Sequence, residues 1–440
     1  MTATAGLDER LHELGAALRA KKRWDERRRQ GPALEALLAH TLASVPAYSD
    51  LARERQGCVS FCNLPVTERR QVAADPSKFR SRRFCDEELS EFSTSGTTGI
   101  PLVVARDLAS LYAFAYDTYR LIFERVPGLR SYLAPGQPAV AVVNDNPQRS
   151  NFVQINPSIE FAMVRRLVIG RSPDEDRAVL LSLCRDTPPL LYGRPRSLLR
   201  LSELAHDLPP GKRARIRPKA ILASGDNLYN TDRNTIEQCF HATVYNAYAS
   251  QEAGLAAMEC VNGNMHVFPE HGAVEVLRSH GAQPSPEGHG ELVISNFENW
   301  AMPFLRYRSG DVGELQQAAC SCGFSGTTIS RVEGRESIYF IVGGRRLNPS
   351  VLNSIFEQLP IRQFQVIQRS GSSFEARWVG DASTTDASGI ERAVSAAIQH
   401  LTGPADVHVC RVATIGGLGE KAQRYVQESA ASDTPSGARY

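Results

Sequence analysis

The sequence predicts an α/β fold in two parts: a large N-terminal domain with parallel or mixed sheets flanked by helices, and a small α+β domain after it. Two observations predict this architecture. From residue 138 to residue 247, short apolar runs alternate with stretches of helical period, which is typical of βαβ units and a parallel sheet. Beyond residue 337, the order strand, helix, strand, strand, helix, strand is typical of a small separate α+β domain.

Length and composition are those of a soluble globular protein. The chain has 440 residues, 42% of them hydrophobic and 22% charged, enough for one large and one small domain. A net charge of +2 gives no reason to expect a nucleic acid or an acidic partner. The longest apolar run, residues 138–143, is too short to cross a bilayer, and residues 1–30 lack a secretory core. We therefore expect a cytoplasmic protein without a membrane partner, and a homodimer is the common default for soluble proteins of this kind.

Local patterns predict the elements of the large domain. Leucines at helical spacing predict one or two amphipathic helices over residues 7–43. A strand follows at 102–106, and residues 109–125 have helical period. Apolar runs predict six further strands, at 139–143, 166–169, 190–192, 220–223, 243–247 and 291–297. Because ligands of parallel sheets bind at the carboxyl ends of the strands, the loops at those ends are the first candidates for a site.

The small domain is also predicted from helical period and from short apolar runs. Its strands are expected at 338–342, 364–368, 374–378 and 407–412, and its helices at 349–358 and 390–401. The final segment, 427–440, is small and polar, which predicts a disordered tail.

One loop has the composition of a phosphate-binding site. It reads Ser95-Gly96-Thr97-Thr98-Gly99-Ile100-Pro101. Glycines let successive amide groups converge on an anion, and the hydroxyl groups add further donors. The loop is not a Walker A loop, because no Gly-Lys-Ser/Thr ending follows. A flexible Ser/Thr-rich hairpin loop would have the same composition, so the loop alone leaves both interpretations open.

The same loop resembles the phosphate loop of the adenylate-forming superfamily, which includes acyl-CoA synthetases, luciferases and non-ribosomal adenylation domains. The chain most resembles the phenylacetate-CoA ligase branch. Leu102 stands where the superfamily usually has a lysine, and that branch also lacks the lysine. The resemblance spans residues 45–426, with further motifs in the family's order, and it implies that ATP and Mg²⁺ bind here.

Two loops at the ends of predicted strands resemble the family's nucleotide site. Ser224-Gly225-Asp226 resembles the loop that lines the nucleotide and acid pockets, although Asp226 would also serve as a helix cap. Residues 245–252 resemble the motif Tyr-Gly-x-Thr/Ser-Glu. This resemblance implies that Ala247 and Tyr248 lie against adenine and that Glu252 binds Mg²⁺, which prefers carboxylate oxygens. From its residue type alone, Tyr248 is more typical of a core residue than of a stacking surface.

The remaining motifs imply a ribose contact, a hinge and a catalytic lysine. Within residues 303–311, the run 307–311 resembles Tyr-Arg-Thr-Gly-Asp, which implies that Asp311 binds the ribose hydroxyls. Arg335 resembles a hinge residue that approaches ribose or phosphate, which sets a large domain at 1–335 and a small mobile lid domain at 336–426. Lys421 resembles the lysine that bridges the acid's carboxylate and the α-phosphate of ATP. The chain departs from the family pattern at Ala249, Gln251, Ser309, Ser337 and Glu420.

Four residues have the chemistry of a structural zinc site. Nine cysteines, an odd number without framework spacing, argue against a disulfide scaffold. Cys260 and His266 form one pair, and Cys320 and Cys322 form a Cys-x-Cys knuckle followed by glycine. Three thiolates and one imidazole would complete a tetrahedral site within the subregion 258–325. Relatives of phenylacetate-CoA ligase have similar segments. The alternative is that these four residues are unrelated and bind no metal, because free cysteines are often simply buried.

The resemblance implies a two-step ligase. A carboxylic acid attacks the α-phosphorus of ATP to give an acyl-adenylate, and after a movement of the small domain an acceptor, coenzyme A in the first instance, takes the acyl group. Polar residues between 144 and 151 favour an aryl acid that carries an amino or hydroxy group. Two alternatives stay open. One is adenylation used for amide formation, AMP transfer or nitrite activation, and the other is a nucleotide-binding relative without catalysis.

Overall fold

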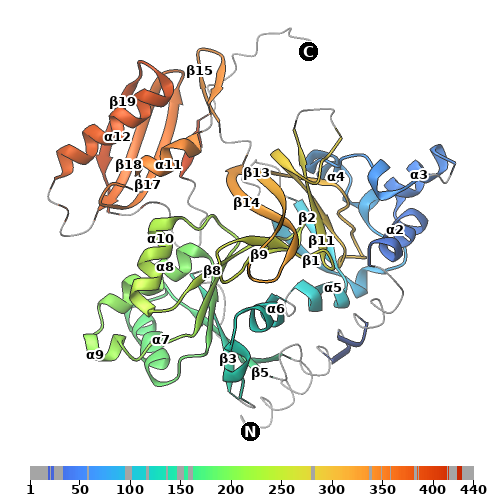
Figure 1. The fold of residues 1–440 in the computed structure, drawn as a ribbon, viewed down its shortest axis with the longest axis horizontal. Helices are drawn as coiled ribbons and strands as arrows, with labels where there is room; N and C mark the ends of the chain where they lie inside the picture. Colours follow the sequence, from blue (N-terminus) through green and yellow to red (C-terminus); the bar gives the residue numbers. More distant parts are fainter. Residues whose placement is uncertain are drawn as a thin grey trace. The chain divides into compact units, whose positions relative to one another are not determined.

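The computed structural model describes most of the chain, and Figure 1 shows its elements. The described residues are 18–19, 21–23, 33–56, 59–94, 102–114, 118–134, 137–145, 153–156, 162–278, 283–335, 339–347, 349–356, 358–380, 384, 386–413, 415 and 424–428. The chain divides into two compact units. The larger unit comprises Met1–Leu228 and Thr235–Val332, and the smaller unit comprises Tyr229–Asn234 and Glu333–Tyr440.

A twelve-stranded mixed sheet is the framework of the larger unit. Its strand order is β11-β12-β13-β14-β10-β9-β8-β7-β6-β3-β5-β4. The five strands β5, β3, β6, β7 and β8 are parallel neighbours, whereas β4 and β9 pair antiparallel at either end of this group. The bounds are β3 Pro138–Asn144, β4 Val153–Asn156, β5 Ala162–Val168, β6 Leu190–Gly193, β7 Ala220–Ser224, β8 Val244–Ser250, β9 Gly254–Glu259, β10 Met265–Val267, β11 Gly272–Leu277, β12 Gly288–Asn296, β13 Tyr307–Ala319 and β14 Ser325–Arg335. The predicted parallel sheet is therefore confirmed.

The parallel strands are apolar throughout because both of their faces are buried. On one face, Ala141, Leu191 and Ile221 pack against α7 (Pro173–Arg185), α8 (Pro195–His206) and α10 (Asn230–Phe240). On the other face, the neighbouring residues Val140 and Leu190 pack against α6 (Thr118–Arg125). This is the usual arrangement of a parallel sheet between helical layers, and it explains why these strands were visible as continuous apolar runs.

The N-terminal part of the larger unit adds short helices and one hairpin. The helix bounds are α2 Ala33–Ser44, α3 Pro46–Glu54, α4 Arg69–Ala74, α5 Leu108–Tyr112 and α9 Pro210–Arg213. The 3₁₀ turns are Phe61–Asn63, Pro76–Phe79, Asp86–Glu88 and Leu129–Tyr132. Strands β1 (Ser90–Thr94) and β2 (Leu102–Arg106) pair antiparallel. The helical period over 109–125 corresponds to α5, a π-helical turn at 113–114 and α6, with 115–117 outside the described residues.

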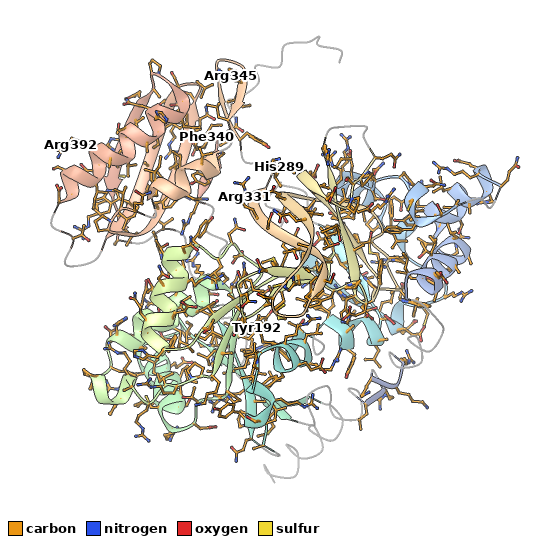
Figure 2. The ribbon with its side chains drawn as sticks, in the orientation of Figure 1. Tyr192, His289, Arg331, Phe340, Arg345 and Arg392 are labelled. Carbon is orange, nitrogen blue, oxygen red and sulfur yellow. The ribbon has the colours of Figure 1, made fainter. Side chains whose placement is uncertain are left out.

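The smaller unit has a four-stranded sheet in the order β19-β18-β17-β20, covered by one long helix. The bounds are β17 Ile361–Ser370, β18 Ser373–Gly380, α12 Ala387–Thr402, β19 Asp406–Arg411 and β20 Tyr425–Gln427. The strand predicted at 338–342 does not join this sheet. It is β15 (Phe340–Val342), which pairs with β16 (Arg345–Leu347). Phe340 is fully buried in the unit's core (Figure 2), which explains the apolar signal.

The helix predicted at 349–358 is also shorter than expected. The structure has a 3₁₀ turn, Pro349–Leu352, followed by α11 (Asn353–Phe356). The fourth strand of the sheet, β20, was not predicted, because three residues carry too little pattern to be recognised. Within the described residues, no helix combines the length and the apolar character needed to cross a membrane.

Candidate active site

The carboxyl ends of β7 and β8 lie side by side and carry two of the predicted nucleotide loops. The two strands are parallel, with Ser224 beside Ala247. Asp226, two residues beyond β7, is half-buried. Burial raises the pKa of Tyr192 on β6, and a hydrogen bond with the side chain of Ser224 opposes this shift. The parallel register therefore places residues 224–226 next to residues 247 and 248.

Tyr248 and Asp311 are joined by a hydrogen bond. The Tyr248 hydroxyl donates to Asp311 Oδ2 across 2.8 Å, although the two residues are 63 positions apart in the chain. The turn that carries Asp311 is held by Ser309. Its hydroxyl donates to the Leu292 carbonyl (2.8 Å) and accepts the Asp311 amide N–H (3.0 Å). Serine at position 309 therefore makes the hydrogen bonds that orient this aspartate.

Glu252 is buried and already has a cationic partner. Arg69, the first residue of α4, donates from Nη1 to Glu252 Oε1 across 3.0 Å. The backbone around the glutamate is fixed as well. Asn296 Nδ2 donates to the Glu252 carbonyl across 3.1 Å, and Arg106 Nη2 donates to the carbonyl of Gln251. Gln251, which departs from the family pattern, thus helps to fix the backbone next to Glu252 through its carbonyl group.

Two arginines within residues 303–311, Arg306 (buried) and Arg308 (partly buried), support the same region. Arg306 donates from Nη2 to Glu275 Oε1 (2.7 Å) and from Nη1 to the Cys62 carbonyl (2.6 Å). Arg308 forms ion pairs with Glu291 and with Glu68. Sequence reasoning gave Glu275 no role, and it missed Glu68 and Glu291. No local pattern marks these carboxylates, because their partners lie far away in the chain.

Several predicted residues cannot be placed. The phosphate loop, Ser95 to Gly99, and Lys421 lie outside the described residues. The strands that flank the loop are described, and they pair Thr94 with Leu102 at its two ends. Arg335 is the last residue of β14, and its side chain is not described. The roles of all these residues remain predictions.

The polar stretch predicted to line the acid pocket is only partly described. Asp145, directly after β3, is 1% exposed. Its Oδ1 accepts hydrogen bonds from Arg194 Nη2 (2.7 Å) and from the Ser197 hydroxyl (2.9 Å). Its charge is therefore neutralised within the fold. Asn146, Arg149 and Asn151 lie outside the described residues.

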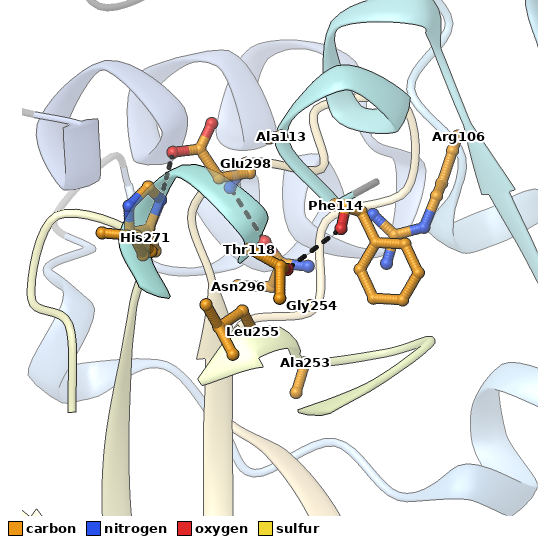
Figure 3. Close-up of a pocket in the computed structure, with 11 residues that line it drawn as sticks. Arg106, Ala113, Phe114, Thr118, Ala253, Gly254, Leu255, His271, Asn296 and Glu298 are labelled. Carbon is orange, nitrogen blue, oxygen red and sulfur yellow. Dashed lines mark hydrogen bonds and ion pairs between the residues drawn. The ribbon is translucent and has the colours of Figure 1, made fainter. Parts of the chain in front are cut away.

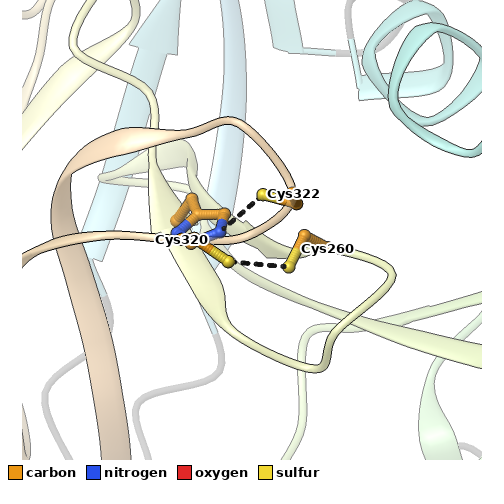
Figure 4. A group of neighbouring side chains, drawn as sticks. Cys260, Cys320 and Cys322 are labelled. Atoms are coloured by element: carbon orange, nitrogen blue, oxygen red, sulfur yellow. Dashed lines mark hydrogen bonds between the residues drawn. The ribbon is translucent and has the colours of Figure 1, made fainter.

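The structure brings Cys260, His266, Cys320 and Cys322 together, and Figure 4 shows the three cysteines side by side. Their ligand atoms all lie within 4.8 Å of one another. Cys260 Sγ is 3.9 Å from Cys320 Sγ, and His266 Nε2 is 3.3 Å from Cys322 Sγ. His266 Nδ1 lies 3.0 Å from the Thr328 hydroxyl, which fixes the direction of the ring. Three sulfurs and one imidazole nitrogen at these separations fit a tetrahedral zinc ion.

Two similar tight turns present the sulfur atoms of this cluster. After β9, the Gly263 amide donates to the Cys260 carbonyl, and after β13 the Gly323 amide donates to the Cys320 carbonyl, both across 2.9 Å. Both glycines have positive φ, +75° and +93°, a conformation that other residues adopt only with strain. The pairing of β10 with β14 brings the two turns together.

Comparisons with known proteins find sequence similarity to phenylacetate-coenzyme A ligases. The chain is 32% identical over 124 residues to phenylacetate-coenzyme A ligase of Thermus thermophilus, a match that covers 27% of this chain and 28% of that protein. It is 29% identical over 147 residues to phenylacetate-coenzyme A ligase of Escherichia coli, covering 31% and 33%. The matches thus span a third or less of these relatives. No family profile matches the chain.

The fold likeness covers far more of the chain. A crystal structure of 2-hydroxyisobutyryl-CoA ligase, in the postadenylation state in complex with 2-HIB-AMP, matches with a TM-score of 0.71. The alignment covers 90% of this chain and 89% of that one, at 18% sequence identity. Likeness at this identity shows the fold: a large sheet flanked by helices, followed by a smaller α+β part.

Proposed function

We propose that this chain, which has the fold of the adenylate-forming ligases and is similar in sequence to the phenylacetate-CoA ligases, is an ATP-dependent acid–CoA ligase. The observation that carries the proposal is the hydrogen bond between Tyr248 and Asp311 beside the carboxyl ends of β7 and β8. An aromatic ring and a carboxylate held together at this edge of the sheet suit an adenine base and a ribose.

The remaining residues are assigned around that nucleoside. Residues 224–226 and Ala247 line the adenine and acid pockets. The loop from Ser95 to Gly99 binds the pyrophosphate portion of ATP through its amides and hydroxyls. Arg335 approaches the ribose or the phosphates, and Glu252 is the ligand for Mg²⁺, which neutralises phosphate charge when bound.

The reaction would proceed in two displacements at this site. A carboxylate oxygen of the acid attacks the α-phosphorus, the bond to the β-phosphate oxygen breaks, and pyrophosphate leaves with the bonding electron pair. Lys421 brings two anions together in this step by offering one cation to both. In the second step the thiolate of coenzyme A attacks the acyl carbon, and AMP leaves. The smaller unit acts as a lid that removes Lys421 between the steps.

We propose an aryl acid as the substrate, with an amino or hydroxy substituent. The proposal is supported by the two relatives, whose names give phenylacetate as the acid. Aromatic side chains near the nucleotide loops also suit a flat acid. Tyr119 and Tyr192 meet edge to face with ring centroids 5.5 Å apart, and Tyr192 is hydrogen-bonded to Ser224.

We also propose that the cluster of Cys260, His266, Cys320 and Cys322 holds one structural zinc ion. All four positions of a tetrahedral ion would be filled by protein atoms, so no position would be left for a substrate or water. The ion would join the turn after β9 to the turn after β13, adding to the β10–β14 pairing and to the hydrogen bond from Asn262 Nδ2 to the Ser321 hydroxyl (2.9 Å). Its contribution would be to stability, not to the ligase chemistry.

Pyrophosphate–ATP exchange tests the first step and separates it from the second. We expect exchange of label from pyrophosphate into ATP with one or more acids from a panel of benzoates, phenylacetates and short aliphatic acids. Coenzyme A should then be needed for a thioester product but not for exchange. Absence of exchange with every acid would contradict the ligase. Exchange without thioester formation would contradict coenzyme A as the acceptor, and exchange with aliphatic acids only would contradict the aryl substrate.

A further inference from the structure

A small recess in the larger unit contains a buried arginine that the proposed chemistry does not use. The space in this recess, counted together with the part that is open to solvent, is about 290 Å³. The walls come from the end of β2, from α5 and α6, from the start of β9, and from the segments around His271 and Asn296. Figure 3 shows Arg106 and His271 on opposite sides of this recess.

Arg106 is fully buried, and only part of its guanidinium group is hydrogen-bonded. Its Nη2 donates to the Gln251 carbonyl, and its guanidinium carbon lies 4.4 Å from the centre of the Phe114 ring. Among the described residues, its Nε and Nη1 have no hydrogen-bond partner. Burial lowers the pKa of Arg106 to about 10, so the side chain is still a cation at neutral pH. The negative charges of Asp107 and Glu252 partly offset this burial. The two unused donors of Arg106 are still unsatisfied, and an anion that accepted hydrogen bonds from them would stabilise the side chain.

The other walls of the recess favour a ligand with one negative charge and an apolar body. Ala113, Leu121 and Leu255 offer apolar surface close to the Phe114 ring. On the far side of the recess, Glu298 Oε1 is hydrogen-bonded to His271 Nδ1 at 3.0 Å. The Glu298 carboxylate in the wall repels a polyanion such as pyrophosphate more strongly than it repels a monoanion.

We propose that this recess binds a small monocarboxylate, with its carboxylate on Arg106 and its body against the apolar wall. Two residues of the recess are hydrogen-bonded to the backbone at or next to Glu252, the proposed magnesium ligand. Arg106 bonds the carbonyl of Gln251, and Asn296, which also lines the recess, bonds the carbonyl of Glu252. The ligand is either a second molecule of the substrate acid or a different monocarboxylate, and these share the same chemistry.

Calorimetric titration of the full chain with sodium benzoate, without ATP and Mg²⁺, tests the proposal. We expect saturable binding with a dissociation constant of about 1 mM or below, and no saturable binding of phosphate at matched ionic strength. Arg106→Gln should weaken benzoate binding about tenfold or more, because a charge-assisted hydrogen bond is lost. The control is Arg125→Gln. Arg125 also lies over an aromatic ring, that of Phe268 at 4.3 Å, but it does not line the recess, so its replacement should leave the affinity unchanged.

A second variant keeps the test valid if Arg106→Gln does not fold. Ala113→Leu adds side-chain volume to the wall without changing charge, and it should also weaken benzoate at least about tenfold in a protein that still melts cooperatively. Absence of saturable binding, or unchanged affinity in folded Ala113→Leu, would overturn the proposal. Equal affinity for phosphate would overturn the monocarboxylate assignment.

The source of the ligand is resolved by comparing acids. Binding only of acids that also support pyrophosphate exchange would assign the recess to the substrate, whereas binding of inactive acids as well would assign it to a separate ligand. Both results support the site. Because the titration contains neither ATP nor Mg²⁺, it would give the same answer if the chain formed no adenylate. Failure of the proposed ligase activity and failure of this site are therefore distinguishable.

Discussion

The Glu252 carboxylate is paired with the Arg69 guanidinium, with Oε1 and Nη1 3.0 Å apart. The two side chains are only 9% and 17% exposed. Glu252 is the proposed ligand of Mg²⁺, so the ion must share or displace a cation that the fold already supplies. Arg69 would thus have two opposing effects: it stabilises the buried carboxylate without metal, and it would compete with a bound Mg²⁺ for the Glu252 carboxylate.

Replacement of Arg69 by methionine should therefore destabilise the metal-free protein and make it respond to Mg²⁺. We expect the free energy of unfolding in urea to fall by about 1–3 kcal/mol without Mg²⁺, because a buried carboxylate loses its partner. Saturating Mg²⁺ with ATP should restore part of this loss in the variant, because the ion replaces the missing charge.

The neighbouring arginine provides a matched control. Arg70 pairs with Glu68, but its side chain is 73% exposed, so Arg70→Met should change the free energy of unfolding by no more than about 0.5 kcal/mol. Equal losses in the two variants would show that the buried pair has no special role. A loss in Arg69→Met that Mg²⁺ and ATP do not reduce would count against Glu252 as the metal ligand.

The Tyr248 hydroxyl holds the proposed ribose-binding carboxylate of Asp311. Tyr248→Phe keeps the ring but removes this hydrogen bond, so it should raise the KM for ATP about three- to tenfold in the exchange assay. Tyr248→Leu removes the ring as well and should raise it further, because stacking on adenine is lost. Tyr245→Phe, on the same strand but in the hydrophobic core, should leave the KM unchanged. Equal KM values in all three variants would contradict the assignment of the nucleoside site.

The sheet could be predicted because its pattern is local. Val140 and Ala141 pack on opposite faces and are both buried, so β3 is a continuous apolar run in the sequence. The same is true of β6 and β7. The small unit was harder to predict. β15 has an apolar signal from Phe340, which is buried in the core, yet the strand pairs with a neighbouring hairpin strand outside the four-stranded sheet.

The candidate site could be predicted only as separate motifs. The identity of Tyr248, Glu252 and Asp311 was visible in the sequence, but the contacts between them and their partners were not. Arg69 lies 183 positions from Glu252, and a charged residue has the same letter whether it is buried in a pair or exposed to solvent. The cysteine cluster was an exception, because metal-ligating residue types with two nearby glycines are unusual enough to be recognised without the fold.

Metal analysis of the purified protein should find about one equivalent of zinc after dialysis. Cys320→Ser and Cys322→Ser should each lose the metal and lower the melting temperature by several degrees, because three ligands hold zinc less tightly than four. Cys410→Ser is the control, since Cys410 lies on β19 in the smaller unit and outside the cluster. Less than half an equivalent of zinc in the unmodified protein would rule out the site.

Lys421→Ala should separate the two half-reactions of the ligase. In the proposed mechanism Lys421 contacts the α-phosphate and the acid's carboxylate only while the adenylate forms, so the variant should lose most of its pyrophosphate exchange, about 100-fold or more. Formation of the thioester from supplied acyl-adenylate and coenzyme A should change by less than about threefold, because the lysine has left the site by then. The second half-reaction also serves as the control for folding, since it requires the same protein to bind the same adenylate. Equal losses in both half-reactions would contradict a lid that removes Lys421 between the steps, and unchanged exchange would contradict its role in adenylation.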